Sequence, residues 1–574
     1  MAPLQGWDES FYVSQLTSAV RDHDLMLQDD LLLVPSSFGE TLRVLTSLGP
    51  GGALDNTFGI GPAVLHSAYA WPVLAGTRGA LSPKLRPLLA CASLVLLTVL
   101  ALACVELLTL FELPFWTSLL ATSLAILSGP LALYGTRYTL GSHLPAAVWV
   151  TLLLLSSVRY ERRASSLGAA FMGFSAGMLV ITRWQDAVLG LPALVALLWP
   201  QPGLKWSRKL WSLLCAASCF AAILGIQLSS WRVQFGSWLT VPQGGAYLSW
   251  VHPRLGAFLL SPYHGSVPWA PGAILGIVAV SFLLERPRRF ERAFAVALLG
   301  SCLLTVYVSS LPRDWWGGDS FGPRRLASLV PAVALGLAAL LKRLRPAPRA
   351  AVAGALGGWA VFVASASLSG FDDLTLLFFG RLSADDPRSL ASYAGTAWRD
   401  PWKAAFFLKP GFTFTDTPRN ADRILGMLAV IGLVALTLAL WRMLLTNRRL
   451  RAGFLGLGLA WVAAWLLLTN AWMPRQGPAN QAWDLVVCGL PDQIGTLPPG
   501  VQEAGHLVLA TYAAAGGNED VVLEQLRFVG PLTGYVVPSR TLLAFGRDSQ
   551  GLAAIRAAQR RGCSASGIGE AALP

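Results

Sequence analysis

The sequence predicts an all-α polytopic membrane protein with a small α/β domain at its C-terminus, and three observations lead to this fold class. Of the 574 residues, 54% are hydrophobic and 13% are charged, about half the charged share of an ordinary soluble domain. Apolar runs recur through most of the chain, and short basic segments separate every second pair of them. A water-soluble fold could not bury so much apolar surface, so soluble classes are excluded.

Twelve apolar runs are long enough, or nearly so, to form transmembrane helices between residues 87 and 470. A helix needs about 20 residues to cross the hydrocarbon layer. Short runs such as 187–199 must therefore borrow flanking residues or lie inside the helical bundle. The twelve runs are 87–111, 114–134, 143–158, 165–182, 187–199, 210–229, 269–284, 293–311, 326–341, 350–367, 423–445 and 453–470.

Basic residues concentrate in every second connection between these runs. The basic segments are 159–163, 205–209, 285–292, 342–349 and 448–451. Positive loops stay in the cytoplasm, so the alternate connections are expected on the outer side. These outer connections are 135–142, 183–186, 230–268, 312–325 and 368–422. The formal charge of +13 thus indicates orientation in an inner (plasma) membrane and contact with the lipid bilayer, and it does not indicate nucleic-acid binding.

The same alternation places residues 1–86 outside as a first outer loop. A translocated segment needs a preceding hydrophobic signal, and the first six residues provide none, so we expect a further helix upstream of this sequence. Counting the run 59–76 as another span would break the alternation. With Pro62 and Pro72, this run is typical of a juxtamembrane or re-entrant helix at the outer interface.

Residues 471–574 differ in kind from the membrane region and predict an extracytoplasmic α/β domain. Short apolar runs indicate strands at 484–487, 507–511 and 541–545, and two longer segments, 518–527 and 550–561, indicate helices. Cys488 and Cys563 are the two of the seven cysteines that lie outside the apolar runs. An oxidising compartment would let this pair form a disulfide. No cysteine spacing is typical of a zinc site.

An acidic pair, Asp8 and Glu9, stands at the head of an expected helix over residues 10–24. Residue statistics favour Asp8 as an N-cap and Glu9 as a first-turn acid that complements the helix dipole. The functional alternative is a carboxylate that acts as general base on an acceptor hydroxyl, with a divalent metal ion that bridges to phosphate.

A second concentration of polar and aromatic residues lies in the outer loop 312–326, which contains Trp315, Trp316, Asp319, Arg324 and Arg325. Each tryptophan could anchor the chain at the headgroups, and each arginine could simply flank a helix. Together they provide aromatic faces for a sugar ring and guanidinium groups for phosphate. Two arginines on the outer side also run against the positive-inside bias.

These stretches resemble the membrane-embedded C-type (GT-C) glycosyltransferases, in particular bacterial relatives of protein mannosyltransferases and of the lipid A aminoarabinose transferase. The resemblance covers roughly the membrane region, and its motifs are of moderate specificity. Members of this family carry a helix before the acidic motif. The stretches that carry the resemblance are Asp8-Glu9 followed by Tyr12, residues 56–69, residues 315–326 with a G-x-S-F-G-P-R sequence, and residues 250–271 with H-P-R and S-P-x-x-G.

The resemblance implies transfer of a sugar from a polyprenyl-phosphate-linked donor to an acceptor glycan, lipid or protein on the outer face. It makes Asp8 the catalytic base and Glu9 its supporting or metal-contacting acid, and a divalent metal ion is the one cofactor considered. Arg324 matches the arginine that would bind the donor phosphate. Weaker phosphate-binding candidates are Arg325, Arg254 and Arg183, and candidate substrate contacts are Trp315, Trp316, Asp319, His252 and Tyr12.

Two other classes stay open. A secondary transporter or lipid flippase would suit twelve spans and intramembrane polar residues such as Glu106, although no internal repeat is visible. A non-catalytic scaffold could present the outer domain, but it would need neither the acidic pair nor the arginine loop. Proximity of Asp8 and Arg324 beside an outward-facing cavity would favour the enzyme.

Overall fold

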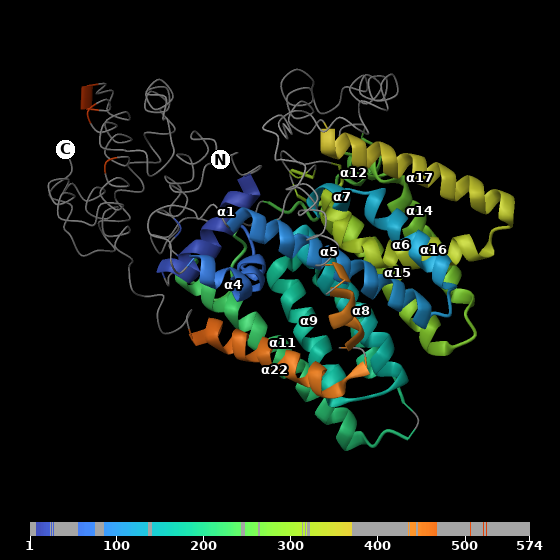
Figure 1. Ribbon diagram of the computed structural model, residues 1–574, viewed down its shortest axis with the longest axis horizontal. Coiled ribbons are helices and arrows are strands. Elements are labelled where there is room, and N and C mark those ends of the chain that lie inside the picture. The colour runs from blue at the N-terminus through green and yellow to red at the C-terminus, as the bar shows by residue number, and fades with distance from the viewer. Residues whose placement is uncertain are drawn as a thin grey trace. The chain divides into compact units, whose positions relative to one another are not determined.

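The computed structural model describes most of residues 56–369 and shorter stretches on either side (Figure 1). The described ranges are 7–22, 56–74, 85–135, 140–201, 203–242, 247–261, 264–312, 314–315, 322–369, 437–443 and 446–467, with isolated positions at 25, 27, 317, 434, 435, 506, 520, 521 and 524. Contacts divide the chain into two compact units. The first comprises residues 1–89, 225–244 and 460–574, and the second comprises 90–224 and 245–459.

Within the described ranges the protein is almost entirely helical, and its one β-type pairing is an isolated bridge between Leu248 and Pro312. The helices that run through the second unit are α5 (Leu85–Leu110), α6 (Phe115–Leu127), α7 (Leu131–Tyr134), α8 (His143–Arg162), α9 (Ser166–Thr182), η2 (Trp184–Gly190), α10 (Leu191–Leu198), α11 (Trp206–Phe235), α12 (Leu255–Leu260), α13 (Ser266–Trp269), α14 (Pro271–Ala279), η3 (Val280–Glu285), α15 (Arg289–Ser310), η4 (Arg324–Leu329), α16 (Val330–Arg343), α17 (Pro346–Ser369) and α22 (Arg448–Leu467).

Five of the described helices are long and apolar enough to cross a membrane. They are Leu88–Leu110, Trp206–Phe235, Arg289–Ser310, Arg324–Arg343 and Arg449–Leu467. Shorter apolar helices cover Phe115–Leu127, Ser166–Thr182, Trp184–Leu198 and Pro271–Glu285. The helical character of the expected runs is therefore confirmed where the structure describes them, while the number of twelve crossings stays a prediction.

Two expected runs are interrupted. The run 114–134 ends as α6 at Leu127 and resumes as α7 at Leu131, because Pro130 has no backbone N–H to continue the helical ladder. The run 187–199 forms the 3₁₀ segment η2 followed by α10, which has only 8 residues. Neither forms one straight helix of spanning length.

Glycines allow the helices of the second unit to approach one another closely. A Cβ atom added to Gly336 of α16 would lie 1.9 Å from the carbonyl oxygen of Gly276 in α14. One added to Gly173 of α9 would lie 2.0 Å from the carbonyl oxygen of Ala216 in α11. Figure 1 shows α6, α14 and α16 side by side. Such small-residue contacts are how helices pack where lipid removes the hydrophobic driving force.

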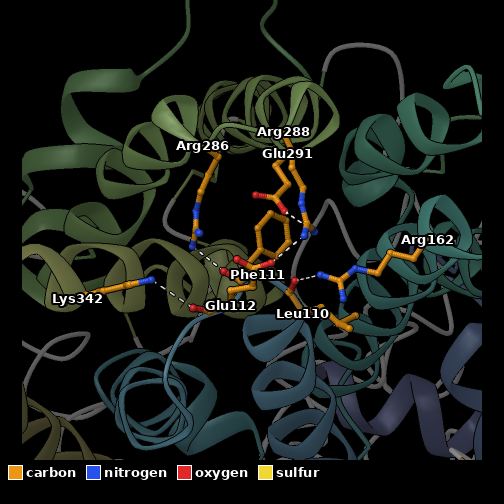
Figure 2. Close-up of polar contacts among 8 residues, drawn as sticks. All are labelled: Leu110, Phe111, Glu112, Arg162, Arg286, Arg288, Glu291 and Lys342. Carbon is orange, nitrogen blue, oxygen red and sulfur yellow. Dashed lines mark hydrogen bonds and ion pairs between the residues drawn. The ribbon is translucent and has the colours of Figure 1, made fainter.

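Three basic segments converge on the turn after α5 (Figure 2). The carbonyl oxygens of residues 110–112 accept hydrogen bonds from Arg162, Arg286 and Lys342, at 2.6 Å for Arg286 and 3.3 Å for Lys342. These carbonyls end a helix and have no intrahelical partner, and cations there also complement the negative end of the helix dipole. We call this end of the second unit the basic end.

The other two basic segments lie at the same end. Arg451 is close enough to Arg159 to repel its charge. Lys209 donates to the carbonyl oxygen of Leu198 at 2.9 Å. The loop that follows Leu198 is linked to the end of α8 by a hydrogen bond of 3.1 Å between Gln201 and the carbonyl oxygen of Tyr160. All five basic segments therefore share one end of the unit, as a cytoplasmic role requires, although the membrane side itself stays a prediction.

In the first unit, α1 (Trp7–Thr17) packs on the chain before α4 (Gly61–Leu74). The ring of Phe58 lies 5.2 Å from that of Phe11 and 5.3 Å from that of Tyr12. Gln15 donates to the carbonyl oxygen of Phe58 at 3.3 Å. These contacts bury one face of α1 against the segment that leads into α4.

The expected juxtamembrane helix over 59–76 is confirmed as a helix of 14 residues, Gly61–Leu74, and it is not among the five helices of spanning character. Indole groups of the last turns of α22 fix it. Trp461 donates to the carbonyl oxygen of Val64 at 3.0 Å, and Trp465 donates to the Ser67 hydroxyl at 3.1 Å.

The predicted C-terminal domain falls almost wholly outside the described residues. This applies to the three expected strands, the helix 550–561 and the Cys488–Cys563 disulfide. Within the expected helix 518–527, the described positions Asp520, Val521 and Glu524 are all helical. The α/β domain therefore stays a prediction.

Candidate functional site

The candidate site lies in the second unit, at the ends of α8, α9 and η4–α16 that are remote from the basic segments. Helix α8 begins at His143 and ends at Arg162, and α9 ends just before Arg183. The third segment begins at Arg324 with η4 and continues as α16 to Arg343. Since α8 has 20 residues, its two ends are about 30 Å apart. The site and the basic end are thus at opposite ends of the same helices.

A buried ion pair forms the base of the site. Arg183 Nε donates to Asp186 Oδ2 at 3.0 Å, and the two side chains are 7% and 0% exposed. The Arg183 guanidinium also bonds His143 Nδ1 through Nη1 at 2.9 Å. Ser328, in η4 just before α16, lies beside the Asp186 carboxylate. The segment after α9 is therefore in polar contact with the beginning of α8 and with η4.

His143 is the centre of this arrangement. Its ring lies 4.4 Å from the ring of Tyr134, and it hydrogen-bonds to the backbone of Arg324. The charges of Arg183, Arg324 and Arg325 all act on it. His143 thus connects the buried ion pair to the two arginines that begin η4.

Arg325 joins its own loop to a loop that is far apart in sequence. Its Nη2 donates to Asp314 Oδ1 at 3.2 Å and to the Tyr247 phenol oxygen at 3.1 Å. Burial raises the pKa of the Tyr247 phenol, so this group stays neutral beside the cation. Arg325 Nε is buried and has no hydrogen-bond partner within the described part of the chain.

The loop that carries Tyr247 runs along the end of α15. The backbone N–H of Ser249 donates to the carbonyl oxygen of Leu311 at 3.0 Å, and the backbone N–H of Arg254 donates to the carbonyl oxygen of Ser310 at 2.9 Å. The Arg254 side chain donates to the carbonyl oxygen of Pro312 at 3.2 Å. His252 is exposed in the same loop.

We call Arg183, Arg324 and Arg325 the arginine cluster. The structure brings these three predicted residues together around His143, and it places Arg254 and His252 in the adjoining loop. Trp315 is buried beside Asp314 in the chain. Trp316 and Asp319 lie outside the described residues.

The other predicted residues belong to α1 in the first unit. Helix α1 begins at Trp7, so Asp8 lies in its first turn rather than at an N-cap preceding a helix at Ser10. Asp8 is half-buried, Tyr12 is buried, and the side chain of Glu9 lies outside the described residues. Proximity of Asp8 to Arg324 and a metal ion on the acidic pair stay predictions. Across the described residues, no group of three or more His, Cys, Asp or Glu side chains could hold a metal ion.

Four further residues of the site, His143, Asp186, Asp314 and Tyr247, were not predicted from the sequence. Two signals could have identified the first two. An apolar run that opens with His143 follows the connection 135–142, and Asp186 stands three residues after Arg183 in the connection 183–186. Asp314 lies in the loop 312–326, 11 residues before Arg325, so its place in that loop was a signal. Tyr247 gave none, because long-range folding brings its loop to Arg325.

The arrangement is suited to binding an anion. Within the described ranges the cluster has three guanidinium groups and two carboxylates, those of Asp186 and Asp314. Arg183 is buried and already contacts Asp186 and His143, whereas Arg324 and Arg325 are half-buried. We therefore expect Arg183 to position the cluster and Arg324 and Arg325 to meet a ligand. Guanidinium groups bind phosphate through paired hydrogen bonds.

Comparison of the chain with protein-family models, with curated proteins and with solved structures finds no match in any of the three.

Proposed function

We propose that the protein is a membrane-embedded glycosyltransferase that moves a sugar from a polyprenyl-phosphate-linked donor to an acceptor on the outer face of the membrane. The observation that carries this proposal is the arginine cluster at the helix ends opposite the five basic segments. The proposal includes the finer topology: twelve spans in the inner membrane, basic segments in the cytoplasm and an extracytoplasmic C-terminal domain.

The donor's chemistry fits this position. A polyprenyl phosphate keeps its tail in the bilayer and its phosphate at the interface. When the bond between the anomeric carbon and the phosphate oxygen breaks, negative charge develops on the leaving phosphate. Arg324 and Arg325, held by His143, Asp314 and Tyr247, would stabilise that charge without reorganisation.

The acceptor hydroxyl must lose a proton as its oxygen bonds to the anomeric carbon. The resemblance of the N-terminal motif assigns this proton to Asp8, with Glu9 as the supporting acid or as a contact for a divalent metal ion. The half-buried position of Asp8 on a regular helix would give its carboxylate a defined direction.

The transporter and flippase alternative rests on twelve expected spans and on intramembrane polar residues such as Glu106. The structure pairs this carboxylate with Arg159 at the basic end, where it joins α5 to α8. The pairing gives this carboxylate a partner between two helix ends, so Glu106 alone does not favour transport over transfer.

The test is a transfer assay on membranes that contain the full-length protein. We expect transfer from one member of a panel of labelled polyprenyl-phosphate sugars. Arg324→Gln should lower the transfer strongly, and Arg208→Gln, an exposed charge at the start of α11 near the basic end, should leave it unchanged. Absence of transfer from every donor, together with lipid movement across proteoliposomes, would replace the enzyme by a flippase.

A further inference from the structure

The basic end contains two groups of arginines and lysines with different surroundings. In the first group, the side chains either form ion pairs with glutamates or donate to the backbone carbonyl oxygens of the turn after α5. The ion pairs are Arg159–Glu106, Arg288–Glu112, Arg288–Glu291 and Arg343–Glu285. Figure 2 shows Arg288 between its two carboxylates, with Arg286, Lys342 and Arg162 around the same turn. These inner cations hold the helix ends together.

The second group consists of exposed arginines. Arg163, Arg289, Arg292 and Arg345 are exposed, and none forms an ion pair or a side-chain hydrogen bond with another residue in the described ranges. Glu106, Glu112, Glu285 and Glu291 are paired with inner cations, while Glu161 lies beside Arg162 and Arg288 and forms no ion pair within the described ranges. We call these four residues the outer arginines.

Two of the outer arginines are direct neighbours of inner cations in the sequence. Arg163 is next to Arg162, and Arg289 is next to Arg288. Arg289 and Arg292 are three residues apart at the start of α15, so they share one side of that helix. In the segments 159–163, 285–292 and 342–349 the fold therefore uses some cations for internal contacts and leaves others exposed to an external anion.

Exposed aromatic rings lie at the same end. Phe115 and Trp116 begin α6 immediately after the Glu112 turn and are 54% and 75% exposed. Trp206 begins α11 and is 71% exposed. Exposed aromatic residues at helix ends are typical of the membrane interface, where they lie at headgroup depth. The outer arginines therefore stand where lipid phosphates are concentrated.

We propose that the outer arginines form a binding surface for the phosphate groups of anionic phospholipids in the leaflet that the basic end faces. The positive charge of the arginines favours anionic headgroups, and each guanidinium group can donate two parallel hydrogen bonds to phosphate oxygens. The aromatic rings beside them favour a lipid over a soluble phosphate, because a lipid also supplies acyl chains for apolar contact. This surface is independent of the arginine cluster and of the transfer reaction.

The test uses the full chain in nanodiscs made of phosphatidylcholine alone or with phosphatidylglycerol. Lipids retained by the protein are measured by native mass spectrometry, and thermal stability is measured by intrinsic fluorescence. We expect phosphatidylglycerol to be retained and to raise the melting temperature of the wild type. The double variant Arg289→Gln/Arg292→Gln should lose retained phosphatidylglycerol several-fold, while its melting temperature in phosphatidylcholine stays that of the wild type.

Two controls separate the alternatives. Arg286→Gln, an inner cation, should lower the melting temperature equally in both lipids and keep the phosphatidylglycerol. If the first double variant fails to fold, Arg163→Gln/Arg345→Gln tests the same surface on other helices. Unchanged phosphatidylglycerol retention in the folded double variants would overturn the proposal. Equal stabilisation by inorganic phosphate in phosphatidylcholine nanodiscs would also overturn it, since the surface would then be a site for soluble anions.

Discussion

Arg286 donates a hydrogen bond of 2.6 Å to the backbone carbonyl of Phe111, a residue 175 positions earlier in the chain. This bond connects the turn before α15 to the turn after α5. The next residue, Glu112, has a φ of 55°, a left-handed conformation that is uncommon for a residue with a side chain. A tight turn of this kind needs partners for its carbonyl groups, and the inner cations provide them.

Arg286→Gln should therefore destabilise the helical region without changing the site at the far end of the helices. Loss of a hydrogen bond from a charged donor to a half-buried carbonyl costs about 1–2 kcal/mol. The melting temperature of the purified protein in one lipid checks this expectation, with Arg208→Gln as a control for charge alone. A melting temperature equal to that of the wild type would show that the turn does not depend on Arg286.

Gly336→Ala should disrupt the contact between α14 and α16. The new Cβ atom would lie 1.9 Å from the Gly276 carbonyl oxygen, so the two helices must separate. Overpacking of this kind costs about 1–3 kcal/mol or more. Gly300→Ala on α15 is the matched control, because its Cβ atom would have no neighbour within 4 Å. Both variants are compared by thermal unfolding, and equal stability would contradict the packing shown here.

Arg183→Gln and Arg324→Lys should separate positioning from ligand binding. The first leaves the Asp186 carboxylate buried without its cation, which costs about 3–5 kcal/mol, so the amount of folded protein should fall. The second keeps the charge and loses the forked contact, so the KM for the donor should rise while stability stays unchanged. Thermal unfolding and donor-dependent kinetics are measured on both. A stable Arg183→Gln protein with raised KM would instead make Arg183 a direct ligand.

Asp8→Asn should abolish sugar transfer in a form that folds normally. Asparagine keeps the shape of the side chain, but it cannot accept the proton of the acceptor hydroxyl. Loss of a general base typically lowers the rate by about 100- to 10,000-fold. Single-turnover transfer, normalised to folded protein, measures the change. Full activity of Asp8→Asn would reduce Asp8 to a first-turn residue of α1.

Single-cysteine labelling tests the orientation in the membrane. A cysteine at Arg345, in the fourth basic segment, should not react with an impermeant maleimide on intact cells. A cysteine at Val251, which is 82% exposed in the loop beside the arginine cluster, should react. Labelling of position 345 from outside would reverse the topology and would also reverse the leaflet that contains the proposed lipid surface.

The sequence predicted the helical class and the position of the helices because apolar runs and basic connections are local patterns. The expected helix 143–158 is α8, and the expected run 59–76 contains α4. Local patterns failed at Pro130, where a proline divides a run of sufficient length into two helices.

The site was predicted only in part, for a physical reason. Arg324 and Arg325 stand in a recognisable loop, but their surroundings come from other helices. His143 and Arg183 are 40 residues apart, and Tyr247 lies 78 residues from Arg325. No spacing rule connects such positions, because packing of whole helices decides which of their ends meet.

The buried pair of Arg183 and Asp186 also constrains how this protein can change over evolutionary time. A substitution of either residue alone would leave the other as an isolated charge in the interior, and most such intermediates would fold poorly. We therefore expect the two positions to co-vary among descendants of this chain. They would be kept together, or they would be exchanged together for an uncharged pair of similar volume.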